Sequence, residues 1–238
     1  MTERACPNLV EVTGVAGAGK STLTRHLLHA TTDGTLAEFI HTRTPRHLAH
    51  VAHSIPHLMP ILAGNLIRAP RLSWADFKLL AYVTEWDRFL DRSLTDRPGI
   101  TLLDQGPIYA LVRLKAQAKG VTRGASFARW WSGSIERWAG ELDVVVFLDA
   151  SDRVLWERIN GRSQPHRTKG EPGDVGREFI ARYRRLFEEA LGRLDVPGGP
   201  EILRFDTSAT AGKRIAAEVA PILTARAERG VVGREARP

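Results

Sequence analysis

Five short apolar runs are spaced along the chain, and longer stretches with helical spacing separate them. The runs are 9–13, 38–41, 100–104, 144–149 and 202–206. The third and fourth runs are rich in Val, Ile and Leu and end in aspartate, which is typical of strands buried on both faces of a parallel sheet. Apolar residues recur at helical spacing in 20–30, 73–95, 107–118, 125–140, 151–160, 176–194 and 211–226. The alternation predicts an α/β fold with a doubly wound parallel sheet.

Two segments interrupt this alternation. Nearly sixty residues separate the second run from the third, so we expect extra helices above the strand ends. Residues 161–176 are polar and contain Gly161, Pro165, Gly170 and Pro172, which predicts a mobile loop. Ligands of open α/β sheets bind beyond the carboxyl ends of the strands, where both insertions begin or pass. The small, charged residues from 226 onward predict a loose tail.

Composition restricts the class of protein. The chain has 238 residues, of which 43% are hydrophobic and 26% charged, so a disordered or collagen-like protein is excluded. A single cysteine, Cys6, excludes an internal disulfide and a multi-cysteine zinc site, and indicates a reducing compartment. Residues 47–67 lack charged side chains, but four histidines and two prolines make them too polar for a membrane span. We therefore expect a cytoplasmic protein.

The formal charge of +7 comes mainly from arginine, since only six of the 34 basic residues are lysine. This excess reflects either a bias toward arginine codons or an anionic ligand, because guanidinium groups match phosphate oxygens. The basic residues are scattered, which disfavours nucleic acid as the partner. Four histidines, His47, His50, His53 and His57, suggest a metal site, but Pro56 interrupts their helical spacing and no carboxylate is near in sequence. We interpret them as a polar helix face or as part of a ligand site.

Residues 14–21 (GVAGAGKS) match the phosphate-binding pattern G-x-x-x-x-G-K-[ST] between a predicted strand and a predicted helix. The glycines let successive N–H groups point at one anion, and the helix N-terminus adds its positive dipole end. Lys20 would reach the outer phosphates, and the Ser21 hydroxyl would ligate Mg²⁺. The predicted ATP-binding residues of this loop are Gly14, Gly17, Ala18, Gly19, Lys20, Ser21 and Thr22. The chain lacks N-K-x-D and L-S-G-G-Q runs, which disfavours a GTPase or a transporter ATPase and leaves small-molecule kinases.

Several segments resemble the thymidylate-kinase-like group of P-loop kinases. Residues 42–45 (TRTP) resemble that family's T-R-E-P, and 79–88 (LLAYVTEWDR) resemble its L-L-x-x-A-D-R. Residues 103–107 (LDQGP) stand where the family has D-R-Y after its third strand. Residues 146–149 and 156–162 resemble the family's fourth strand, its next helix and the start of its lid, a piece that is also similar to adenylate kinases.

The resemblance implies a three-layer P-loop NTPase fold, in which a five-stranded parallel sheet of order 2-3-1-4-5 has helices on both faces. It also implies one kinase domain over residues 1–225. An acceptor-site helical insertion would occupy about 46–95, a lid loop about 161–176, and a flexible tail 226–238.

The resemblance also implies roles for individual residues on the nucleotide side. Asp104, at the end of the third predicted strand, would bind a water of Mg²⁺ or accept a proton, and its alternative role is to cap the helix that starts near Pro107. Arg158 would stack on adenine, Arg162 would reach the transferred phosphoryl group, and Arg167 would close over it. The alternative is that these three arginines are merely solvated.

Arg43 and Arg88 are the candidates that bind the phosphoryl acceptor, although Arg88 can instead pair with the adjacent Asp87. Two positions depart from the family pattern, because Thr44 replaces a carboxylate and Gln105 replaces an arginine that helps to hold the acceptor. An amide can hydrogen-bond a hydroxyl or carbonyl but supplies no charge, so we expect Gln105 to bind an acceptor other than thymidylate.

We therefore predict an ATP- and Mg²⁺-dependent kinase of a small acceptor, chiefly a nucleoside monophosphate or related phosphorylated metabolite. A hydroxyl acceptor, such as a nucleoside, sugar or antibiotic, would need a base such as Asp104. A nucleotide-binding regulatory protein and a nucleic-acid end kinase are the remaining alternatives. Trp130, Trp131 and Trp138 share one predicted helix as core or subunit-contact residues, which leaves a homodimer open.

Overall fold

The central strand of the sheet is β1, and parallel strands pair with it on both sides. The computed structural model describes residues 8–31, 34–38, 77, 80, 81, 83, 84, 99–117, 124–163 and 168–235. The described strands are β1 (Asn8–Gly14), β2 (Gly34–Glu38), β3 (Ile100–Asp104), β4 (Val144–Asp149) and β5 (Glu201–Asp206). They pair in the order β2-β3-β1-β4-β5, and every pair is parallel. The predicted α/β class with a parallel sheet is confirmed.

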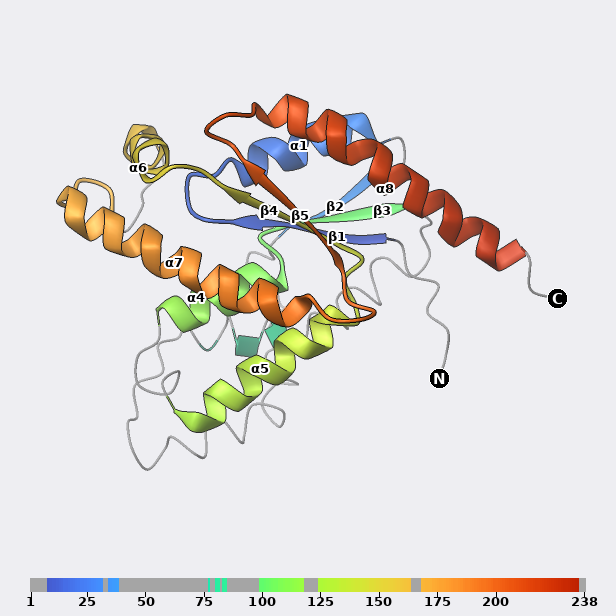
Figure 1. The fold of residues 1–238 in the computed structure, drawn as a ribbon, viewed down its shortest axis with the longest axis horizontal. Helices are drawn as coiled ribbons and strands as arrows, with labels where there is room; N and C mark the ends of the chain where they lie inside the picture. The colour runs from blue at the N-terminus through green and yellow to red at the C-terminus, as the bar shows by residue number, and fades with distance from the viewer. Residues whose placement is uncertain are drawn as a thin grey trace, which may run out of the picture.

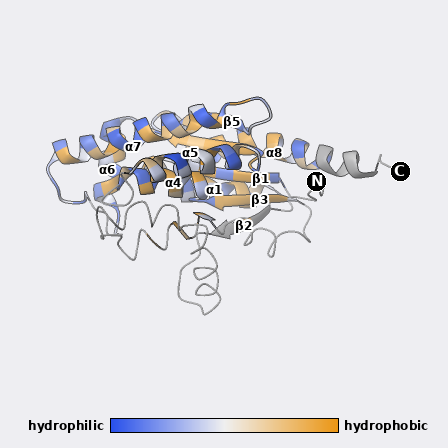
Figure 2. Cartoon of the chain, turned by 90° about the horizontal axis from the view of Figure 1, so that it is seen from below, coloured by the Kyte–Doolittle hydropathy of each residue, from blue (hydrophilic) through white to orange (hydrophobic). Residues whose placement is uncertain are grey.

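Helices cover both faces of this sheet (Figure 1). Their bounds are α1 (Lys20–Ala30), α4 (Pro107–Ala116), α5 (Ala125–Ala139), α6 (Asp152–Gly161), α7 (Gly173–Leu194) and α8 (Gly212–Glu235). Helices α1 and α8 pack together on one face, while α7 contacts α4 and α5 on the other. Figure 2 shows the apolar residues concentrated on the strands between these layers, as expected for strands buried on both faces.

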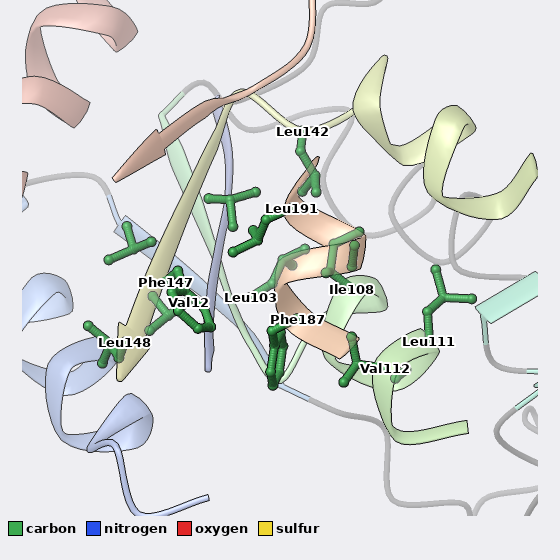
Figure 3. Close-up of a cluster of buried hydrophobic side chains, with 14 of the residues drawn as sticks. Val12, Leu103, Ile108, Leu111, Val112, Leu142, Phe147, Leu148, Phe187 and Leu191 are labelled. Carbon is green, nitrogen blue, oxygen red and sulfur yellow. The ribbon is translucent and has the colours of Figure 1, made fainter. Parts of the chain in front are cut away.

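The core lies on both faces of the sheet, and Figure 3 shows part of it. Phe147 of β4 packs against Phe187 of α7, with 5.4 Å between the ring centroids. Trp131 and Trp138 of α5 are almost completely buried, and the Trp131 indole N–H donates to the carbonyl of Leu111. The predicted core role of these two tryptophans is confirmed. No helix among the described residues is both long and apolar enough to span a membrane.

Two element boundaries differ from the prediction. The sequence predicts that the second strand begins at Glu38, but β2 ends at that residue. The reason is that β2 is the edge strand and pairs from Gly34 to Glu38 with the five residues of β3. Residues 39–41 of that prediction lie outside the described residues. Residues 226–235, where the sequence predicts a loose tail, belong to α8, which ends at Glu235. Arg226 is held by Glu201 at the start of β5, with 2.7 Å between Nη2 and Oε2.

The loop predicted over residues 161–176 is shorter in the structure. Helix α6 includes Gly161, and α7 begins at Gly173, three residues before the predicted start. A Cβ at Gly176 would lie 2.1 Å from the Trp156 ring, so the first turn of α7 crosses α6 closely enough to require glycine. The contact between the two helices thus extends α7 into a segment whose glycines and prolines predicted a loop.

Candidate functional site

The glycine-rich loop, residues 14–19, joins β1 to α1 beside the end of β4. Gly14 has φ 142°, and a Cβ there would lie 2.0 Å from the Leu148 carbonyl oxygen. Gly17 has φ 92°, and a Cβ there would lie 3.0 Å from the Leu155 carbonyl oxygen. Gly19 is the N-cap of α1 in the left-handed conformation, and no side chain among the described residues caps this helix. The loop therefore turns its backbone through conformations that favour glycine, and the positive end of α1 is left for an anion.

Lys20 is held against the glycine-rich loop. Its Nζ donates to the carbonyls of Gly14 and Val15 at 2.9 and 3.0 Å, and only 9% of the residue is exposed. Burial lowers the pKa of Lys20 to about 8, with Asp104 opposing this shift and Arg162 adding to it. Lys20 thus lies within electrostatic reach of Asp104 and Arg162, which the sequence predicts to act in the reaction.

Asp104 ends β3 beside Val12 of β1, and its Oδ1 is buried without a hydrogen-bond partner in the described structure. An unpaired buried carboxylate oxygen is costly, so its occurrence calls for a ligand or a functional role. Ser21, the predicted metal ligand, is exposed at the start of α1. Oxygen donors of these two types suit Mg²⁺, so the residues present fit the implied ion.

Gln105 follows Asp104 with φ 60°, the only positive φ among the described non-glycine residues. Such a backbone costs roughly 1–3 kcal/mol and persists where the surroundings enforce it. Gln105 also lines the cavity described below, as expected for a residue that contacts a bound molecule.

Sequence reasoning missed Glu11, which caps α4 in place of Asp104. Its Oε2 accepts the N–H of Ile108 at 2.9 Å, and its Oε1 accepts the N–H of Tyr109 at 2.8 Å. Burial raises the pKa of Glu11 to about 7, the two backbone bonds oppose that shift, and the charge of Asp104 adds to it. The alternative role of Asp104 as the cap of this helix is therefore wrong. A single acid inside the apolar run LVEVT was the signal available in the sequence.

A cavity of about 700 Å³ opens over the glycine-rich loop. Its lining residues are 17–23, Arg25, Gln105, Leu148, Arg158, Gly161, Arg162, Thr207, 210–212 and Ile215. The cavity is therefore bounded by the start of α1, the end of α6 and the residues that follow β5. Its volume falls within the range of cofactor and small-molecule sites.

Arg158 connects two walls of this cavity. Its Nη1 donates to Thr207 Oγ1 at 2.9 Å and to the Gly17 carbonyl at 3.3 Å, and its Nη2 donates to the Thr207 carbonyl at 2.9 Å. Thr207 is anchored in turn, because its N–H donates to the Asp149 carbonyl at 2.8 Å. The alternative of a merely solvated Arg158 is wrong, since its guanidinium joins the glycine-rich loop to the loop after β5.

Arg162 follows α6 as its C-cap residue, in extended backbone conformation. Helix α6 ends at Gly161, so only Arg158 lies within the helix, but both arginines line the same cavity. The Lys169 ammonium donates to the Arg162 carbonyl. The structure therefore brings Lys20, Arg158 and Arg162 to one cavity, with Asp104 close to Lys20.

Asp149, at the end of β4, has a structural partner that the sequence did not indicate. Arg184 of α7 donates from Nε to Asp149 Oδ2 at 2.6 Å and from Nη1 to Asp152 at 2.8 Å. These carboxylates raise the pKa of Arg184 above its usual value, chiefly through the hydrogen bond to Asp149. The interaction ties α7 to the strand end that also anchors Thr207.

Four predicted features lie outside the described residues: Arg43, Arg88, Arg167 and the histidine segment 47–57. No cluster of three or more His, Cys, Asp and Glu side chains suited to a metal occurs within the part of the chain that the structure describes.

Comparison with known proteins identifies the fold. No protein-family description matches the chain, and no curated protein matches it in sequence. Thymidylate kinase from Candida albicans is a structural neighbour with a TM-score of 0.58 and 16% identity, and the match covers 93% of this chain and 92% of that one. Deoxyadenosine kinase from M. mycoides with bound dATP has a TM-score of 0.51 and 13% identity, with coverage of 89% and 98%. The same enzyme with bound dCTP gives 0.53 and 11%, with coverage of 89% and 97%. The resemblance to thymidylate-kinase-like proteins is thus matched by fold neighbours over nearly the whole chain.

Proposed function

We propose that the chain is an ATP- and Mg²⁺-dependent kinase that transfers the γ-phosphoryl group to a small acceptor. The observation that carries the proposal is the convergence of the glycine-rich loop, Lys20, Arg158 and Arg162 on one cavity of about 700 Å³. Phosphoryl transfer needs positioning and neutralisation of charge on the moving group, and this cavity offers cations and backbone N–H groups for both. The kinase folds of the structural neighbours support the same reaction class.

The nucleotide would lie along the cavity with its phosphates on residues 14–22 and its base near Thr207. Lys20 would leave the Gly14 and Val15 carbonyls to bind the β- and γ-phosphates. Arg158 would stack on adenine from the position in which Thr207 holds it. Arg162 would bind the γ-phosphoryl group during its transfer. Arg167, which lies outside the described residues, would bind the same group.

Ser21 and Asp104 would hold Mg²⁺, Asp104 through a water molecule. The ion would supply positive charge to the β- and γ-phosphate oxygens. The unpartnered Oδ1 of Asp104 supports this assignment. In the transfer step an acceptor oxygen forms a bond to the γ-phosphorus while the bond to the β–γ bridging oxygen breaks, and ADP leaves.

The preferred acceptor is a nucleoside monophosphate or a related phosphorylated metabolite. Its phosphate oxygen is already a nucleophile, so Arg43 and Arg88 would bind it and Gln105 would contact its neutral part. A hydroxyl acceptor is the second candidate, because Gln105 offers an amide where a charge was expected. Asp104 Oδ1, which has no partner among the described residues, could accept the hydroxyl proton. The neighbours' names span both acceptor types, a thymidylate kinase and a deoxyadenosine kinase.

A screen of nucleosides, monophosphates, sugars and alcohols with labelled ATP tests the proposal. Transfer to a monophosphate that falls roughly tenfold to a hundredfold in Arg43→Ala and Arg88→Ala, with ATP affinity retained, supports the preferred acceptor. Loss of most activity in Asp104→Asn, with a rate that rises with pH in the parent protein, supports a hydroxyl acceptor instead. ATP binding without transfer to any compound would refute the kinase and favour a nucleotide-binding regulatory protein.

A further inference from the structure

Glu11 is a charged residue in the central strand of the sheet, and the reaction proposed above gives it no task. The residue is completely buried, and it does not line the cavity. A buried carboxylate is costly unless its oxygens are hydrogen-bonded. Both oxygens of Glu11 are bonded, and both bonds come from backbone N–H groups of α4. The position of Glu11 is therefore built around the start of this helix.

Helix α4 depends on Glu11 for its N-terminal cap. Gly106 is the N-cap residue and offers no side chain, while Pro107 has no N–H to satisfy. The next two N–H groups, of Ile108 and Tyr109, are the ones that Glu11 accepts. A Cβ at residue 106 would lie 2.7 Å from Glu11 Cδ, so only glycine allows the carboxylate this close. The cap thus comes from a neighbouring strand, not from the residue before the helix.

The turn that leads into α4 carries two residues of the site. Asp104 has a buried oxygen without a hydrogen-bond partner in the described structure, and Gln105 has a positive φ. Both features cost free energy, so the flanking structure must hold the turn in place. Pairing of Asp104 with Val12 holds one side, and the bonds from Glu11 to α4 hold the other.

We propose that Glu11 is a positioning residue, which fixes Asp104 and Gln105 relative to Lys20 by capping α4. This proposal rests on the kinase function proposed above. Without the cap, the turn relaxes and Asp104 moves relative to the phosphates, while residues 14–22 still bind the nucleotide. Loss of Glu11 therefore lowers the transfer rate much more than it lowers the affinity for ATP.

The decisive variant is Glu11→Gln, which keeps the shape but replaces one acceptor oxygen by an NH₂ group. Its matched control is Asp143→Asn, because Asp143 Oδ2 likewise accepts a backbone N–H, that of Leu9 at 2.8 Å, close to the amino end of β1. Phosphoryl transfer from MgATP to the best acceptor of the screen, or to water, is expected to fall by roughly tenfold or more in Glu11→Gln and to change little in Asp143→Asn. In the Asp104→Asn background, Glu11→Gln should add almost no further loss.

A second variant and a second readout keep the proposal falsifiable. In Gly106→Ala the new Cβ would clash with the Glu11 carboxylate from the helix side. This variant should show the same loss of phosphoryl transfer and replaces Glu11→Gln if that variant does not fold. Amide exchange at Gln105 and Gly106, which Glu11 does not bond directly, should accelerate in Glu11→Gln but not in Asp143→Asn.

Unchanged transfer, or an equal loss with and without Asp104, would overturn the role of Glu11. If the parent protein transfers phosphate to nothing, the kinase function fails and the exchange readout decides alone. Faster exchange confined to Ile108 and Tyr109 would then reduce Glu11 to a simple helix cap and overturn the proposal.

Discussion

Arg158→Ala is the substitution whose effect follows most directly from the geometry of the site. The guanidinium makes two contacts of 2.9 Å with Thr207 and one of 3.3 Å with Gly17, and both of these residues line the cavity. A net hydrogen bond is worth about 0.5–1.5 kcal/mol, so the two short contacts hold Arg158 on Thr207 by roughly 1–2 kcal/mol at this partly exposed position. Affinity for ATP should therefore fall about 5- to 30-fold.

Isothermal titration calorimetry with MgATP measures this change. The matched control is Arg153→Ala on the same helix, because the Arg153 side chain is 82% exposed and pairs only weakly with Glu157, at 3.4 Å. The control should shift affinity by less than about threefold. Arg158→Lys keeps the charge but loses the planar fork and should fall between the two. Equal affinities of Arg158→Ala and Arg153→Ala would refute the reasoning.

Three further predictions test the loop and the buried charges. Lys20→Ala should lower turnover by roughly 10²–10³ while the circular dichroism spectrum stays unchanged, and normal turnover in the folded variant would end the kinase proposal. Gly14→Ala should destabilise the protein far more than Gly19→Ala in thermal unfolding, because a Cβ at residue 14 meets the Leu148 carbonyl at 2.0 Å whereas one at residue 19 meets nothing within 4 Å. Equal melting temperatures would show that positive φ alone sets the cost. Burial raises the pKa of Glu11 from 4.5 to about 7, so the folded chain binds more protons than the unfolded chain between these values and the contribution of Glu11 to stability falls as pH rises through this window. In urea unfolding, Glu11→Gln should therefore gain stability relative to the parent protein from about pH 5 to pH 7.5, and a pH-independent difference would contradict the assigned pKa.

The strands and the glycine-rich loop could be predicted because their signals are local. The runs at 100–104 and 144–149 form β3 and β4 at the predicted residues. An unbroken apolar segment of this length is typical of a strand that is buried on both faces of a parallel sheet. Gly14, Gly17 and Gly19 adopt positive φ angles, which fit the tight turn expected of the glycines in this motif. In each case the residues whose pattern allows the prediction are the same residues that form the strand or the loop.

The remaining features depend on partners that are distant in sequence. The register of β2 is set by β3, and the length of α8 is supported by the ion pair of Arg226 with Glu201. The acceptors of Arg158, on Gly17 and Thr207, lie 141 and 49 residues away. Nothing in the local sequence of an arginine in an arginine-rich chain identifies such partners.

Local costs converge at one edge of the sheet, where β1 and β3 end. Lys20 is a buried cation with a lowered pKa, Asp104 has a buried oxygen without a partner in the described structure, and Gln105 has a strained backbone. Each departs from a rule that most of the described core obeys, and a foldable sequence tolerates such conflicts where function demands them. A bound polyphosphate with its metal would relieve the first two, because it would give Lys20 an anion and Asp104 a cation's water to bind. The same ligand would thus relieve both costs, which favours a polyphosphate with its metal over a neutral ligand at this site.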